Sequence, residues 1–260
     1  MIDWRGWKSR RGRQAVARQW AALADSATHG RRAPDPELRD EAVQLHADLG
    51  RFIQHGDASQ MRARDDLQLL DLPPGTDWRW RPMMLRGRIV PAAVVAAENG
   101  QSLSPEVVVW HDCSHRAVIL RQVRNRQGTD LARYGITLEV MGFSGSYLSL
   151  ALDLPPDVLE ALGPDQNLRM DVQLSAERAM VVYGRINVAQ GPDTAHVLRQ
   201  LGNPIEGRTN PRVVEFDLAY AELSARPVDK VWLDLIFESP GMNAITVTDL
   251  VMSRHPRAQM

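Results

Sequence analysis

Short runs of alternating apolar and polar residues, separated by turn-forming residues, fill the chain from residue 106 onward. Leu168, Met170 and Val172, for example, alternate with polar residues, so their side chains share one face of an extended strand. The strand-like segments are 106–110, 117–124, 136–142, 147–153, 168–174, 180–188, 213–219, 231–238 and 245–253. Proline and glycine lie between many of them. We therefore predict a mainly β fold: an antiparallel, jelly-roll-like β-sandwich of about nine strands.

A parallel α/β fold needs a helix between successive strands. Residues 156–162 and 194–201 are the segments that could supply such helices, and both are short. This scarcity of connecting helices favours the antiparallel arrangement.

Two amphipathic segments precede the strands. In residues 12–27, Val16, Trp20 and Leu23 recur at helical spacing, and residues 35–56 carry a second apolar stripe. We predict that these segments form an α-helical hairpin.

The chain is thus expected to have three parts. Residues 1–58 form the helical hairpin with a basic start, and residues 59–104 form a linker rich in proline and glycine that packs on the sandwich. Residues 105–260 form the sandwich domain.

Composition excludes several classes of protein. The chain is 44% hydrophobic and 24% charged, as is typical of globular proteins, which excludes disordered and fibrous chains. The longest uncharged apolar stretch, Ile89–Ala97, is much shorter than the roughly 20 residues of a membrane span. The first residues lack the pattern of a secretory signal, so we expect a cytoplasmic protein. Release by a route other than general secretion stays open.

Charge is concentrated at the N-terminus. Residues 1–32 carry eight basic and two acidic side chains, whereas the whole chain has 31 basic and 32 acidic residues. Such a segment can contact a protein, an anionic surface or nucleic acid, and a solvated helix face explains the same pattern. We expect a protein partner at these helices and regard nucleic acid as unlikely.

The single cysteine, Cys113, excludes an internal disulfide and a multi-cysteine metal site. It lies in His111-Asp112-Cys113-Ser114-His115, but adjacent residues of a strand point to opposite faces and cannot converge on one metal ion. We predict a strand end and turn with a buried thiol. A Cys113 nucleophile activated by His111 or His115 is the alternative.

The predicted strands 180–188 and 231–238 each combine an apolar face with a face of aromatic and polar side chains. Flat rings suit the C–H faces of sugars, and planar polar groups suit their hydroxyls. Packing of Trp232 and Tyr183 beneath the helices or beneath residues 71–92 is the alternative. The predicted ligand-binding residues of this face are Tyr183, Arg185, Asn187, Trp232 and Asp234.

Trp78 and Trp80 lie two residues apart, with Arg79 between them. In an extended chain both tryptophan rings point the same way. They are candidates for a stacking platform in ligand binding, or they anchor the segment onto the sandwich.

The chain resembles an uncharacterised bacterial family of unknown function over most of residues 75–258. The resemblance implies no activity. The stretches that carry it are Gly75-Thr76-Asp77-Trp78-Arg79-Trp80-Arg81-Pro82, His111-Asp112-Cys113, Leu120-Arg121-Gln122-Val123-Arg124-Asn125, Ser149-Leu150, Leu152-Asp153-Leu154-Pro155, Trp232-Leu233-Asp234-Leu235-Ile236-Phe237-Glu238 and Met242-Asn243.

A looser resemblance, carried by Ile245-Thr246-Val247-Thr248-Asp249-Leu250-Val251, is to galactose-binding-like jelly rolls and carbohydrate-binding modules. Asp249 is in phase with the apolar Ile245 and Val247, an unusual place for a charge that is neither paired nor bound to an ion. In those modules such a position can lie near a structural calcium, so Asp249 is a weak candidate metal ligand. No other cofactor is expected.

We therefore predict a non-catalytic module that binds a glycan on its aromatic and polar sheet face. A structural protein that uses the sandwich for assembly is one alternative. A glycan-active hydrolase is another, with an acid pair such as Glu215 with Asp217 or Asp234 with Glu238 on one strand face. An enzyme is the less favoured of these readings.

Overall fold

The computed structural model describes residues 4–29, 35–45, 48–49, 71–125, 131–160 and 162–257. The chain divides into two compact units, Met1–Phe52 and Ile53–Met260. The predicted boundary at residue 58 lies outside the described residues.

The first unit is helical in its described parts. Helix α1 spans Trp4–His29, and residues 36–45 and 48–49 are also helical. In α1, Trp20 and Leu23 are half-buried, whereas Val16 is exposed. Pairing of the two helical segments as a hairpin stays a prediction. Within the described residues, no helix has both the length and the apolar character needed to cross a membrane.

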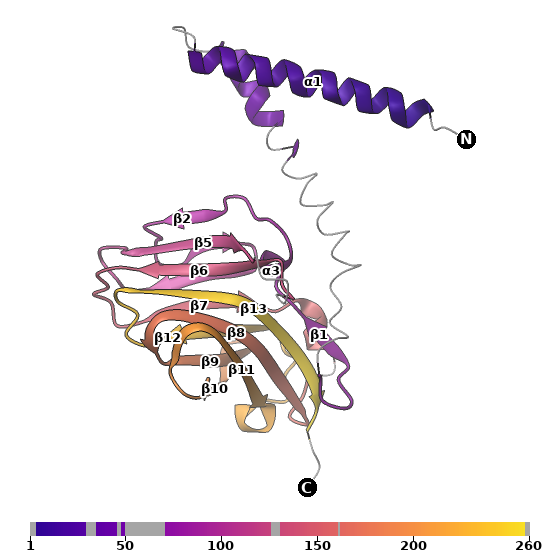
Figure 1. Ribbon diagram of the computed structural model, residues 1–260. Helices are drawn as coiled ribbons and strands as arrows, with labels where there is room; N and C mark the ends of the chain where they lie inside the picture. Colours follow the sequence, from indigo (N-terminus) through magenta and orange to yellow (C-terminus); the bar gives the residue numbers. More distant parts are fainter. Residues whose placement is uncertain are drawn as a thin grey trace. The chain divides into compact units, whose positions relative to one another are not determined.

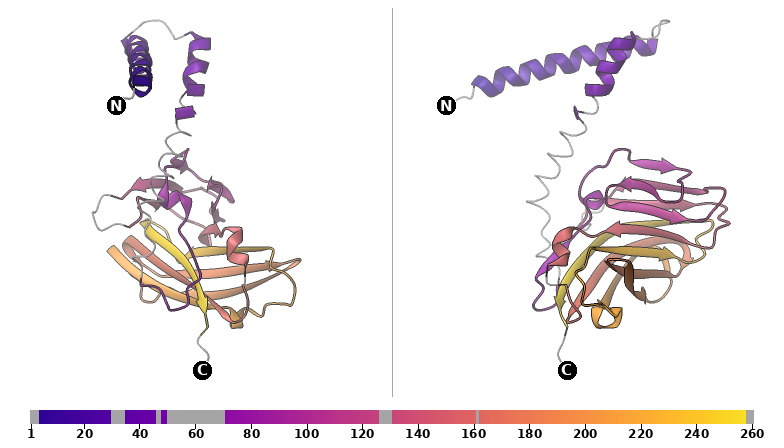
Figure 2. Two further views of the ribbon diagram at one scale, coloured as in Figure 1. Left: turned by 90° about the vertical axis from the view of Figure 1, so that its right-hand side faces the viewer. Right: turned by 180° about the vertical axis from the view of Figure 1, so that it is seen from behind.

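The second unit is a sandwich of two antiparallel sheets (Figure 1). The seven-stranded sheet has the order β11-β8-β13-β6-β5-β2, with β1 paired to β13, and the six-stranded sheet has the order β10-β9-β12-β7-β4-β3. Figure 2 presents the same strands from the side and from behind. The strands of the first sheet are β1 (Trp78–Trp80), β2 (Ala93–Val95), β5 (Val118–Arg124), β6 (Tyr134–Val140), β8 (Gln166–Met180), β11 (Ile205–Asp217) and β13 (Asn243–Pro256). Those of the second are β3 (Gln101–Ser104), β4 (Val107–His111), β7 (Leu148–Asp153), β9 (Val182–Gln190), β10 (Asp193–Gln200) and β12 (Lys230–Phe237).

The prediction of a mainly β, antiparallel sandwich is confirmed, with thirteen strands in the described residues. Each of the nine predicted segments is a strand. Residues 78–104, predicted as part of the linker, contribute β1, β2, β3 and the short helix α3 (Met83–Arg86). These strands have three or four residues, too few for a clear alternating pattern.

One segment that we considered for a helix is a strand. Residues 193–200 form β10, which pairs with β9 along its whole length. A continuous ladder of backbone hydrogen bonds outweighs the weak helical pattern of this segment. In the other segment, the described residues form a 3-10 turn, η2 (Pro156–Leu159), and a second such turn, η3 (Leu218–Ala221), follows β11.

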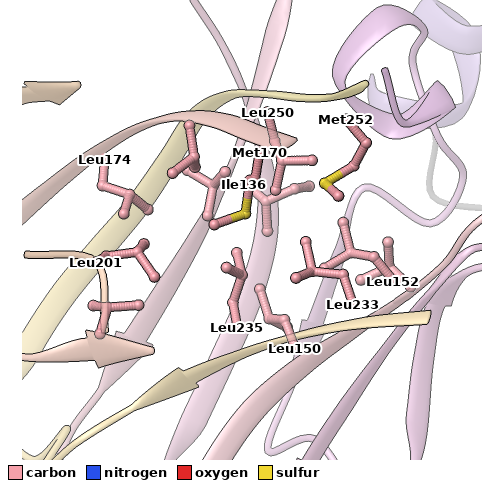
Figure 3. Packing of buried hydrophobic residues seen from close by; sticks show 14 of the residues in the cluster. Ile136, Leu150, Leu152, Met170, Leu174, Leu201, Leu233, Leu235, Leu250 and Met252 are labelled. Carbon is pink, nitrogen blue, oxygen red and sulfur yellow. The ribbon is translucent and has the colours of Figure 1, made fainter. Parts of the chain in front are cut away.

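The hydrophobic core lies between the two sheets (Figure 3). Leu150 of β7 and Leu233 and Leu235 of β12 face it from one sheet, and Ile136 and Met170 face it from the other; all five are fully buried. Because side chains alternate along a strand, the residues between them point to the outer face of the six-stranded sheet. This alternation places the site described next.

Candidate ligand-binding groove

An open groove of about 510 Å³ lies on the outer face of the six-stranded sheet, across β4, β7, β12 and β9. A volume of this size falls in the range of small-molecule sites, roughly 300–1,000 Å³. Its lining residues are Val108, Trp110, Tyr147, Ser149, Ala151, Asp153, Arg185, Lys230, Trp232 and Asp234.

The groove exists because small outward side chains lie between large ones. Ser149 and Ala151 on the middle strand β7 form the floor. On one side Trp110 of β4 is paired with Ser149, and on the other Trp232 of β12 is paired with Asp153. The two tryptophans therefore project beside a low floor and form its walls.

Trp110 is held in place by the turn that precedes β3. Gly100 has a φ of +75°, and its N–H donates to the carbonyl of Val109 at 3.0 Å. A Cβ at Gly100 would lie only 3.2 Å from the Trp110 ring. The ring thus packs against the glycine, yet Trp110 remains 43% exposed. It offers a positioned apolar surface to the groove, next to Tyr147, which is also exposed.

A polar cluster forms the β9 side of the groove. Arg185 donates from Nε and Nη2 to Oδ2 of Asp234 at 3.1 and 2.7 Å, and Asn187 donates to the same oxygen at 2.9 Å. Asp234 is buried, whereas the Arg185 side chain is 40% exposed. Within the described residues, Oδ1 of Asp234 and Nη1 of Arg185 have no hydrogen-bond partner, so a ligand can use both.

A second ion pair lies at one end of the groove. Lys230 Nζ is 2.8 Å from Oδ2 of Asp153 and 5.8 Å from the centre of the Trp232 ring. The half-buried Trp232 therefore forms a wall beneath a cation, and Trp110 and Tyr147 offer the more open rings.

The predicted ligand face is brought together in part. Arg185, Trp232 and Asp234 line the groove. Asn187 supports Asp234 from beside it, and is itself buried. Tyr183 belongs to the same sheet face but is not a lining residue; its hydroxyl donates to Glu238 at 3.5 Å.

The structure corrects the prediction that Trp78 and Trp80 bind a ligand. They are 7% and 9% exposed and belong to the hydrophobic core, on strand β1 beside β13. Arg79, between them, is the exposed residue. The alternation was predicted correctly, but the rings face inward and anchor the segment.

An ion pair with Arg81 accounts for the charge of Asp249 in this apolar part of the sequence. Arg81, 3% exposed, donates from Nε and Nη2 to the two carboxylate oxygens of Asp249 at 2.8 and 3.0 Å. The register of β13 against β8 shifts by one residue between Val247 and Asp249, and this bulge turns Asp249 off the core face. A calcium ion at this carboxylate would have to displace the guanidinium. The described residues contain no group of three or more metal-capable side chains.

Cys113 is buried, as predicted, beside a second cavity of about 390 Å³. His111 accepts from the Cys113 backbone N–H through Nδ1 and contacts the Ala97 carbonyl through Nε2, so both ring nitrogens are engaged away from the thiol. Burial alone would raise the pKa of the thiol, but hydrogen bonds from the backbone of Ala117 and Ser144 and from the Ser144 hydroxyl lower that pKa to about 7.

Sequence reasoning missed Trp110, Tyr147, Lys230 and Asp153. The outward direction of Trp110 could be read from its alternation with the buried Val109. The sequence does not show that Trp110 lies across β7 from Trp232, because β4, β7 and β12 are far apart in the sequence.

Comparison with known proteins identifies the family but not an activity. The chain belongs to a family of unknown function (DUF6478), which matches residues 2–260. Membership in an uncharacterised family was predicted and is confirmed. No curated protein sequence matches the chain.

The chain is also similar, at low TM-scores, to parts of solved structures. The enzymatically active domain of tailspike protein 4 from bacteriophage CBA120 has a TM-score of 0.42 at 6% identity, over 56% of this chain and 19% of that one. The chain thus spans about a fifth of that solved chain. The family 11 carbohydrate-binding module from Clostridium thermocellum has a TM-score of 0.39 at 10% identity, over 60% and 92%. A xylan-binding domain from Paenibacillus barcinonensis has a TM-score of 0.37 at 7% identity, over 64% and 94%.

Proposed function

We propose that this family member is a non-catalytic binding module that holds a glycan in the groove across β4, β7, β12 and β9. The observation that carries the proposal is the pairing of an exposed, positioned Trp110 ring with a partly unsatisfied Arg185–Asp234 pair above a small-residue floor.

The aromatic side chains suit the apolar part of a sugar. A pyranose ring presents C–H groups on its faces, and these pack on flat aromatic surface. Trp110 and Tyr147 supply such surface, and the small Ser149 and Ala151 leave room for the ring above them.

The polar side chains suit the hydroxyls. Each hydroxyl both donates and accepts, so it is matched by a neighbouring donor and acceptor. Nη1 of Arg185 is such a donor and Oδ1 of Asp234 such an acceptor. The hydroxyl of Ser149 on the floor can serve as either.

The ion pairs made by the groove carboxylates favour binding over hydrolysis. A glycosidase needs one carboxyl group as a proton donor and another as base or nucleophile. Here Asp153 is paired with Lys230 and Asp234 with Arg185, so both carboxylates already serve as partners of a cation. Of the two predicted acid pairs, Asp234 with Glu238 is divided, because Glu238 does not line the groove. Glu215 with Asp217 lies on β11 of the opposite sheet, where Asp217 is bound by Arg257.

The test is a glycan-array screen of the full chain, followed by calorimetric titration of each hit. Trp110→Ala should weaken binding by at least about tenfold, equivalent to about 1.4 kcal/mol, because it removes the stacking surface. Tyr220→Ala is the control, since Tyr220 is also an exposed aromatic, on η3 and outside the groove.

Either of two results would overturn the proposal: a folded protein that retains no glycan, or a hit whose affinity is unchanged in Trp110→Ala. A blank array together with larger particles in light scattering would favour the assembly alternative instead.

A further inference from the structure

The charges in the groove cancel locally. Lys230 is paired with Asp153 at 2.8 Å, and Arg185 is paired with Asp234 at 2.7 Å. No other charged side chain lines the groove within the described residues. Each cation is already neutralised by a carboxylate, so an acidic ligand would gain little net attraction and would be repelled by Asp153 and Asp234.

The two tryptophan walls are placed diagonally. Trp110 pairs with Ser149 and Trp232 with Asp153, four residues further along β7. Two strand spacings and four residue rises put their Cα atoms about 16 Å apart. A single pyranose ring is much shorter than this distance, so one sugar cannot contact both walls.

The midpoint between Trp110 and Trp232 lies beside polar side chains. Ala151 lies halfway between Ser149 and Asp153 on β7 and pairs with Asp234 on β12. A ring above Ala151 therefore lies beside Asp234, which is paired in turn with Arg185 on β9, and these two residues offer one acceptor, Oδ1, and one donor, Nη1, beyond the bonds that they make to each other. An acceptor and a donor on neighbouring residues match two adjacent hydroxyls, each of which can donate or accept.

We infer that the groove binds an uncharged, linear oligosaccharide laid from Trp110 to Trp232, with two adjacent hydroxyls of a central ring bound by Arg185 and Asp234. This inference rests on the proposed function and adds the ligand's charge, length and orientation.

The experiment is a calorimetric titration of the full chain with two series of soluble oligosaccharides. One series is neutral, from a single ring to about six rings, and the other contains uronic acids at matched lengths. We expect affinity for the neutral series to rise by at least about tenfold from one ring to the length that reaches both tryptophans, and then to level off. We expect the acidic series to bind at least about tenfold more weakly at equal length.

Ala151→Leu tests the orientation without touching the core, because residue 151 points into the groove. The longer side chain should fill the place of the central ring and reduce affinity for the long neutral ligand by at least about tenfold, with the melting temperature unchanged. Ala189→Leu is the matched control: Ala189 lies on β9 outside the groove lining, and its variant should bind within about twofold of the native protein.

Preference for the acidic series would refute the inferred charge and leave glycan binding standing. Equal affinity for one ring and for long chains would refute the inferred length in the same way. Unchanged binding in Ala151→Leu would refute the orientation. Absence of binding to every sugar by the folded chain would refute the proposed function itself.

Discussion

Replacing Asp249 by alanine should strongly destabilise the sandwich. The carboxylate accepts two hydrogen bonds from Arg81, whose side chain is 3% exposed, while Asp249 itself is 14% exposed. The guanidinium comes from the segment after β1 and the carboxylate from β13, so the pair joins two distant parts of the sequence. Asp249→Ala leaves a buried cation without this partner.

Removal of one member of a buried ion pair costs about 3–5 kcal/mol. Because Asp249 retains some contact with water, we expect the lower end, about 3 kcal/mol. For a unit of this size, each kcal/mol lowers the melting temperature by about 2–4 °C, so the transition should fall by about 6–12 °C.

The assay is thermal unfolding followed by circular dichroism, with Asp193→Ala as control. Asp193 pairs with Arg226, but both side chains are more than half exposed. Such surface pairs contribute about 0–1 kcal/mol, so this control should melt within a few degrees of the native protein.

Equal and small shifts in both variants would refute the assigned role of the buried pair. The same experiment tests the calcium alternative. A melting temperature that rises with added calcium in the native protein, but not in Asp249→Ala, would show that Asp249 binds the ion instead of Arg81.

Two further outcomes are expected. Trp80→Ala should lower the free energy of unfolding by about 3–5 kcal/mol in urea titrations, because the ring is buried between the sheets; a loss below about 1 kcal/mol would place it outside the core. The rate of Cys113 alkylation should rise with pH around a midpoint of about 7, because the thiolate is the reactive form, and Ser144→Ala should move this midpoint upward; a native midpoint near 9 would contradict the lowered pKa.

Part of the candidate site was predictable because strand geometry is local. Alternation along 231–238 places Leu233 and Leu235 inward and Trp232 and Asp234 outward, and the structure has them so. The same alternation put Arg185 and Asn187 on one face of β9. The choice of a mainly antiparallel sandwich follows from the same repeated pattern and the scarcity of helices between strands.

Other features needed the whole fold. Trp78 and Trp80 share one face, as predicted, but pairing of β1 with β13 turns that face into the core. Asp249 is in phase with Val247 in the sequence, and a one-residue bulge reverses the phase. A bulge leaves almost no mark in the sequence, since it changes which residues oppose each other and not their chemistry.

The sequence by itself therefore determined nine of the thirteen strands of the described residues, the alternation of side chains along them and the class of fold, because these depend on neighbours in the chain. The tertiary structure alone decided that β7 lies between β4 and β12, so that Trp110 and Trp232 flank Ser149 and Ala151. Strand order and register depend on packing between segments that are far apart in the chain, and the groove is a product of that packing.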